Sequence, residues 1–102
     1  MEIEFNIVDD TLYILLIGEL DDSTSDYVRT ILDEALRKYT YQNVVYDMSR
    51  LDFMDSTGIG VLIGRYKFLK NRNKNSYICK PSSTIEKIFR MSGLFEIMPK
   101  IS

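Results

Sequence analysis

Hydrophobic and polar residues alternate at the start of the chain, and a nearly continuous apolar run follows. Ile3, Phe5 and Ile7 alternate with polar neighbours, a pattern typical of a half-buried strand. The run from Thr11 to Ile17 is apolar enough for a more buried strand. Because only the turn signal Asp9-Asp10 separates these two segments, they predict an antiparallel hairpin.

Three later segments carry apolar residues at helical spacing. The first helix is expected from about Ser23 to Lys38, opened by a capping box that Ser23 forms with Asp26. The second is expected from about Thr57 to Asn71. A third follows the capping serines at 82 and 83 and ends at the Ser92-Gly93 stop signal, running back toward the opposite end of the sheet.

Short buried strands alternate with these helices. They are expected at about 43–48 and 76–80, with a loop over 49–55 and the tail at 94–101 as a candidate fifth strand. The resulting order, β-β-α-β-α-β-α-β, predicts an α/β fold. We expect a mixed, mostly parallel sheet of four to five strands, packed with helices, whose N-terminal strand is antiparallel. With 102 residues and no internal repeat or linker, the chain is expected to form one domain, 1–102.

The composition excludes several common chemistries. The chain has no histidine and one cysteine, Cys79, so the usual Ser-His-Asp and Cys-His nucleophiles and histidine-based zinc sites are excluded. A net charge of −2 does not indicate nucleic-acid binding. No apolar run approaches the ~20 residues of a membrane span, and the acidic N-terminus is unlike a signal peptide. We therefore expect a cytoplasmic protein without metal or cofactor, with Cys79 as a core residue.

Two loops at the carboxyl ends of neighbouring strands are the expected site. The loop at 18–23 carries Asp21 and Asp22, and the loop at 51–58 carries Asp55 and Ser56. Since one crossover separates their strands, the loops should lie side by side and concentrate acidic groups around the Ser56 hydroxyl. A structural interpretation is favoured by these residues alone: the two aspartates as turn residues and Ser56 as a helix N-cap. Capping and function can coexist.

The glycines at 58, 60 and 64 superficially resemble a dinucleotide-binding motif at the start of the second helix. The third glycine is one position too far along, and no acidic residue follows ~20 positions later to hold a ribose. The phosphate-binding P-loop pattern is absent as well. Close helix packing is therefore the preferred interpretation, and no nucleotide cofactor is expected.

Two strings of residues resemble the core signature of STAS domains, the bacterial anti-sigma factor antagonists. They are Val44-Val45-Tyr46-Asp47-Met48-Ser49 and Phe53-Met54-Asp55-Ser56-Thr57-Gly58-Ile59-Gly60-Val61-Leu62. Gly18-Glu19-Leu20-Asp21 resembles the other marked loop of the family. Gly64-Arg65-Tyr66-Lys67 and Met91-Ser92-Gly93-Leu94-Phe95 resemble most the antagonists that act in sporulation. The resemblance covers essentially the whole chain.

The resemblance implies partner switching. The unmodified family protein binds an anti-sigma factor that is also a serine kinase, and this binding frees the sigma factor. The kinase then uses ATP and Mg²⁺ to phosphorylate the serine after the motif's aspartate, here Ser56, and switches binding off. A metal-dependent, PP2C-type phosphatase reverses the modification. Thr57 is a weaker candidate for a second acceptor.

The resemblance also implies roles for single residues, with Thr57 among the partner-binding set. Asp55 would orient the loop and the acceptor hydroxyl, while Asp21 and Asp22 would contact basic groups of the kinase. Gly58 and Gly60 would let a partner or the helix backbone approach closely. Asp47, expected at the end of the third strand, would be structural. No residue is expected to be catalytic, since the transfer chemistry belongs to the kinase.

Two other functions remain open from the residues. One is an enzyme with Ser56 as nucleophile, which the missing histidine and the absent oxyanion motif disfavour. The other is a STAS module that binds a nucleotide or lipid and is not regulated by phosphorylation.

Overall fold

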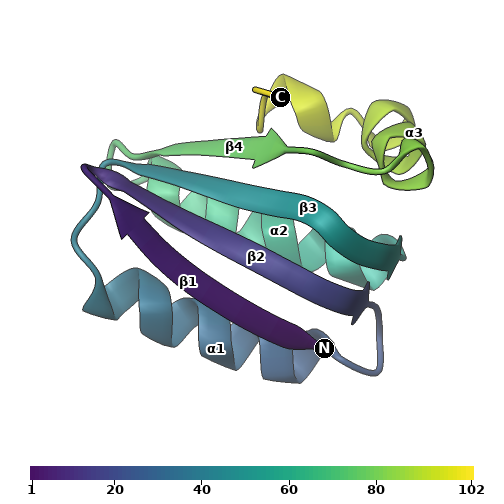
Figure 1. Cartoon of the computed structure of the whole chain (residues 1–102), viewed down its shortest axis with the longest axis horizontal. Coiled ribbons are helices and arrows are strands. Elements are labelled where there is room, and N and C mark those ends of the chain that lie inside the picture. Colours follow the sequence, from purple (N-terminus) through teal and green to yellow (C-terminus); the bar gives the residue numbers. More distant parts are fainter.

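The computed structural model describes all 102 residues, which form four strands, three helices and a final 3₁₀ turn (Figure 1). In chain order these elements are β1 (Glu2–Val8), β2 (Thr11–Leu20), α1 (Ser25–Lys38), β3 (Asn43–Met54), α2 (Ser56–Lys70), β4 (Asn75–Cys79), α3 (Ser83–Ser92) and η1 (Leu94–Glu96). The predicted α/β order is confirmed up to α3.

The strands lie side by side in the order β1-β2-β3-β4. β1 and β2 pair antiparallel from Glu2↔Ile17 to Val8↔Thr11, and the other two pairs are parallel. Asp9 closes the hairpin with a φ of 55°, a left-handed conformation that aspartate tolerates better than most residues. The predicted mixed sheet with an antiparallel N-terminal strand is therefore confirmed.

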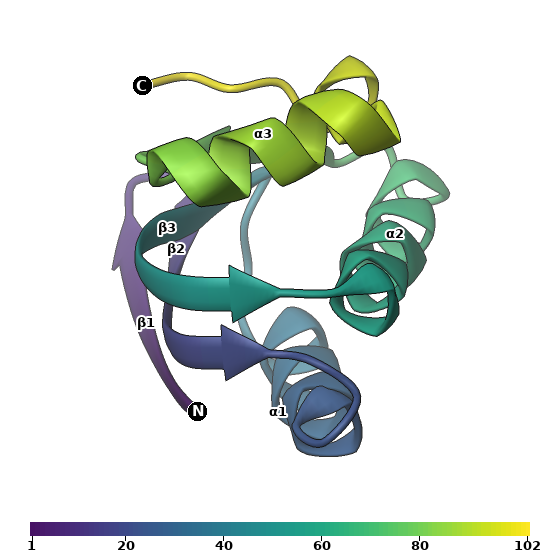
Figure 2. The ribbon, with the colours of Figure 1, turned by 90° about the vertical axis from the view of Figure 1, so that its right-hand side faces the viewer.

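α1 and α2 pack on one face of the sheet, as Figures 1 and 2 show. The residues of β2 that point to these helices, Leu12, Ile14 and Leu16, are fully buried. Leu32 of α1 and Leu62 of α2 meet them in the core. These two helices place their N-terminal ends just after the carboxyl ends of β2 and β3, where the candidate site lies.

β3 is longer than predicted, because residues 49–54 continue the strand and do not form a loop. They pair with the end of β2, from Ile17↔Arg50 to Leu20↔Met54, across two shifts of register. In this stretch Leu51 and Met54 are buried and the residues between them are exposed. Because these bulges replace the two-residue alternation, the pattern of hydrophobic residues concealed the strand.

α3 lies across the strand direction and packs against β3, so the prediction that it runs back along the sheet is wrong (Figure 2). β4 pairs only with residues 43–47 of β3, which leaves the second half of β3 without a strand neighbour on that side. The buried residues Ile85 and Phe89 form the inner face of α3. A helix placed there covers apolar surface that β4 is too short to cover.

The tail forms no fifth strand. After η1 it makes one isolated parallel bridge, between Ile78 and Lys100. The Ile78 N–H donates to the Pro99 carbonyl and the Ile101 N–H donates to the Ile78 carbonyl, each at 2.9 Å. The predicted helix stop is confirmed, because Gly93 ends α3 with a φ of 74°.

Candidate functional site

The segments that follow β2 and β3 lie side by side at the carboxyl ends of these strands, as Figure 2 shows, although both are shorter than predicted, since β2 runs to Leu20 and β3 to Met54. Asp55 joins the two segments. Its Oδ1 accepts a hydrogen bond from the Gly58 N–H at 3.0 Å, and its Oδ2 accepts one from the Asp22 N–H at 3.2 Å. Its own N–H donates to the Leu20 carbonyl at 3.4 Å. One carboxylate thus caps α2 and holds the neighbouring loop against it.

Ser56 is the first residue of α2, and Asp55 is the N-cap, so the interpretation of Ser56 as a cap is wrong. Asp55 takes this role because it is the last residue with extended backbone before the helix, and its carboxylate accepts from the Gly58 N–H. The Ser56 side chain is exposed, and its hydroxyl makes no hydrogen bond. The helix start leaves the N–H groups of Ser56 and Thr57 without an intrahelical acceptor, so this position favours an anion.

The predicted capping box between Ser23 and Asp26 is also absent, because α1 begins at Ser25. The Asp21 carboxylate builds the turn before it, accepting from the Ser23 hydroxyl at 2.7 Å and from the N–H groups of Ser23 and Thr24 at 3.0 and 3.2 Å. These hydrogen bonds, the one from the Ser23 hydroxyl foremost, lower the pKa of Asp21. The Asp21 carboxylate therefore stabilises its own turn.

Asp22 differs from its neighbour. Its backbone N–H is bound to Asp55, while its carboxylate is exposed and forms no hydrogen bond or ion pair. Of the two predicted acidic contacts, Asp22 is the one whose side chain is available to another molecule. Asp47 lies within β3 and not at its end, and its carboxylate accepts from the Ser49 N–H at 2.9 Å.

The two glycines of the motif have separate roles. A Cβ on Gly58 would lie 2.3 Å from the Leu20 carbonyl oxygen, so the close approach at this position is made by the protein's own backbone. A Cβ on Gly60 would meet nothing within 4 Å, and this residue is exposed. Thr57, between Ser56 and Gly58, is half-buried. Only Gly60 leaves space for a partner.

Two exposed aromatic side chains flank the loops, and sequence reasoning missed both. Phe53, at the end of β3, is 43% exposed, and Tyr27, in the first turns of α1, is 53% exposed. Tyr27 fits the helical spacing of the apolar residues of α1, which conceals its exposure. Phe53 was assigned to a loop. The polar neighbours Asp52 and Asp55 around it were the available signal of exposure.

No helix of the chain combines the length and apolar character needed to cross a membrane. No three histidine, cysteine, aspartate or glutamate side chains gather into a metal-binding group, even where the acidic loops meet. Cys79 is buried, as predicted.

Comparison with known proteins shows which family the chain belongs to. The STAS domain family model matches residues 2–102. An anti-sigma F factor antagonist from Paenibacillus polymyxa is 38% identical over 99 residues, which cover 97% of this chain and 85% of that relative. An anti-sigma-B factor antagonist from Staphylococcus epidermidis is 32% identical over 98 residues, covering 96% of this chain and 90% of that relative.

Solved structures agree. The anti-sigma factor antagonist SpoIIAA in its unphosphorylated form superposes with a TM-score of 0.81 and 29% identity, over 99% of this chain and 89% of that one. The Bacillus cell fate determinant SpoIIAA in its phosphorylated form gives 0.73 at 29% identity, over 99% and 92%. The chain therefore belongs to the STAS family and, within it, to the anti-sigma factor antagonists. These are regulatory proteins and not enzymes.

Proposed function

We propose that the unphosphorylated protein binds an anti-sigma factor that is also a serine kinase, and that phosphorylation of Ser56 ends this binding. The kinase brings ATP and keeps ADP, and a PP2C-type phosphatase restores the hydroxyl. The setting is the cytoplasm. The names of the relatives support an anti-sigma partner, and a phosphorylated form of SpoIIAA supports the modification. We favour the anti-sigma F partner and sporulation control, because identity to the anti-sigma F relative is 38% against 32% for the anti-sigma-B relative.

The single observation that carries the proposal is the state of the Ser56 hydroxyl. It is exposed, unbonded and at the start of a helix, so a kinase can reach it without breaking any contact of the fold. Thr57 is half-buried behind it, which supports Ser56 over Thr57 as the acceptor.

A phosphate on Ser56 should leave the fold intact. The free N–H groups and the positive end of α2 favour an anion at this place. The phosphate adds about −1.5 to −2 charges at neutral pH, beside the carboxylates of Asp55 and Asp22. The partner surface therefore changes strongly in charge. A penalty of ~3 kcal/mol on binding would weaken affinity more than a hundredfold.

The proposed contact surface follows from exposure. Asp22 and Gly60 would touch the partner directly, with Phe53 as an apolar anchor at the edge. Asp21, Asp55 and Gly58 would act indirectly by holding the two loops in place, and Thr57 would contact the partner only at its exposed part.

The test mixes the protein with a cognate serine kinase and ATP and maps the phosphosite by mass spectrometry. Ser56→Ala should abolish phosphorylation and keep anti-sigma binding, whereas Ser56→Asp should weaken binding. Thr57→Ala is the matched control and should still be phosphorylated. Equal affinity of the anti-sigma factor for the phosphorylated and unphosphorylated protein would refute the switch.

A further inference from the structure

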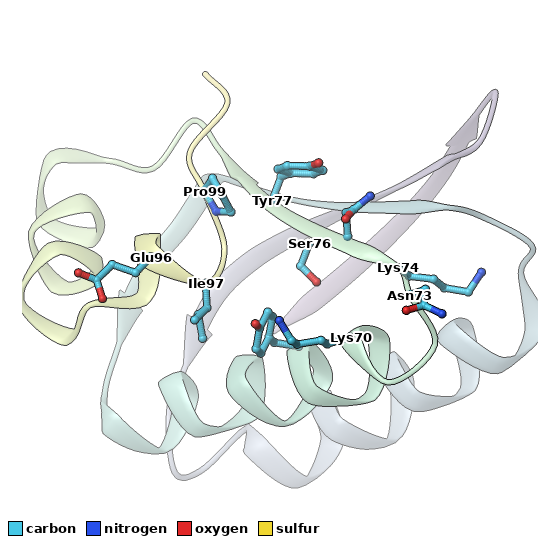
Figure 3. A pocket seen from close by; sticks show the side chains of 10 residues that line it. Lys70, Asn73, Lys74, Ser76, Tyr77, Glu96, Ile97 and Pro99 are labelled. Carbon is cyan, nitrogen blue, oxygen red and sulfur yellow. The ribbon is translucent and has the colours of Figure 1, made fainter.

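A cleft of about 570 Å³ lies between the second half of α2, β4 and the tail (Figure 3). It is at the opposite end of α2 from Ser56. Because α2 has 15 residues and rises ~1.5 Å per residue, roughly 20 Å separate the cleft from the acceptor serine. The cleft is therefore distinct from the two loops of the candidate site, and its volume suits a small organic molecule.

Ser76 lines this cleft, and its hydroxyl is buried in the cleft wall without a partner. Ser76 is 5% exposed, and its Oγ makes no hydrogen bond. Figure 3 shows its side chain pointing from β4 toward α2, into the space beside Lys70. A buried hydroxyl that lacks a partner is unfavourable, and most buried polar groups in proteins are satisfied. An acceptor group bound in the cleft would satisfy this one.

The cleft lining carries two lysines and one carboxylate, so it has an excess of positive charge. Lys70 forms no ion pair, and its Nζ lies 5.8 Å from the centre of the Tyr66 ring. Lys74 is already engaged, since its Nζ donates to the Tyr41 carbonyl and lies 4.5 Å from the centre of the Tyr41 ring. Glu96 is the one carboxylate of the lining, and it forms no ion pair either. Lys70 is thus the ammonium left to meet an anion.

We propose that this cleft binds a small molecule through a phosphate group. The Ser76 hydroxyl donates to a phosphate oxygen, and the Lys70 ammonium balances its charge. Tyr66 and Ile97 supply apolar surface for the rest of the molecule. A phosphate fits better than a carboxylate, because it carries more negative charge for the Lys70 ammonium and more acceptor oxygens, so that it can also accept from Ser76. This inference does not rest on phosphorylation of Ser56.

The test follows backbone amide NMR shifts of the unphosphorylated, kinase-free protein. Its probes are inorganic phosphate and glucose 6-phosphate, with acetate as the carboxylate. We expect saturable shifts around Lys70, Ser76 and Ile97 with either phosphate probe, and tighter binding of glucose 6-phosphate because it fills more of the cleft. Lys70→Ala should weaken binding about tenfold, the loss expected for one charge-assisted hydrogen bond.

Ser76→Ala keeps the fold testable, because its hydroxyl makes no hydrogen bond that the substitution would remove. It should weaken phosphate binding about fivefold and raise the urea midpoint of unfolding or leave it unchanged, because the buried hydroxyl has no partner to lose. Lys67→Ala is the matched control, since Lys67 is an exposed lysine of α2 outside the cleft lining. The proposal is overturned if Lys67→Ala and Lys70→Ala weaken binding equally, if the shifts do not saturate, or if acetate binds as tightly as phosphate.

Discussion

Replacing Gly58 by alanine is expected to destabilise the protein, whereas the same change at Gly60, two residues further along α2, is expected to stabilise it. A Cβ at position 58 would lie 2.3 Å from the Leu20 carbonyl oxygen, 2.8 Å from Met54 Cγ and 2.9 Å from Leu20 Cγ. The nearest of these atoms is backbone, and Leu20 and Met54 are both buried. The start of α2 would therefore have to move away from the end of β2.

The magnitude is a balance of two effects. Overpacking a close-packed site costs about 1 to 3 kcal/mol, and a contact of 2.3 Å with a backbone oxygen places Gly58 in the upper half of that range. The higher helix propensity of alanine offsets up to about 1 kcal/mol of this. Gly58→Ala should thus lower the free energy of unfolding by about 1 to 2 kcal/mol. At Gly60, where a Cβ would meet nothing within 4 Å, only the propensity gain remains, and unfolding should cost about 0.5 to 1 kcal/mol more.

Urea unfolding of the two variants and the wild-type chain, followed by circular dichroism, measures both values. Gly64→Ala is a second control, because a Cβ there would also meet nothing within 4 Å. If Gly58→Ala were as stable as the wild type, or if Gly60→Ala lost as much stability as Gly58→Ala, the assignment of close packing to Gly58 alone would be refuted.

Asp55→Ala should lower the free energy of unfolding by about 2 kcal/mol, because the helix cap and the hydrogen bond to the Asp22 N–H are both lost. Hydrogen exchange at the Asp22 amide should accelerate, and unchanged exchange would contradict a hydrogen bond between Asp55 and this amide. Tyr46→Phe should raise the urea midpoint or leave it unchanged, because the buried Tyr46 hydroxyl has no hydrogen-bond partner. A clearly lower midpoint would mean that the hydroxyl does make a stabilising hydrogen bond. Hydrogen bonds, the one from Lys100 foremost, lower the pKa of Glu86 in the folded protein. The ionised Glu86 side chain therefore stabilises the fold above about pH 4.5, and this stabilisation is lost as the pH falls through the lower folded-state pKa. Glu86→Gln should flatten that acid-side loss in urea unfolding at a series of pH values, and an unaltered pH profile would count against the ion pair.

Most of the fold followed from local patterns. The β1–β2 hairpin, α1, α2 and the first half of β3 each have a period or a turn signal of their own, so sequence neighbours were enough to find them. The final half of β3 and the course of α3 were missed for one shared reason. The second half of β3 depends on bulged pairing with β2, and the course of α3 depends on the short length of β4. Both are relations between distant segments.

The site divides in the same way. Sequence by itself indicated that the segments after β2 and β3 lie side by side, because one helical crossover separates the two strands, and the resemblance to the family pointed to Ser56. It misplaced the start of the second loop, because residues 51–54 belong to β3. Only the tertiary structure decided what each residue does there. In the structure Asp55 caps α2 and binds the Asp22 N–H, while the Asp21 carboxylate accepts hydrogen bonds within its own turn. The Asp22 carboxylate makes no hydrogen bond, and only Gly58 of the two glycines is closely packed. The physical reason is that the bond from the Asp22 N–H to Asp55 and the close approach of Leu20 to Gly58 join atoms distant in the chain, and no local pattern carries those distances.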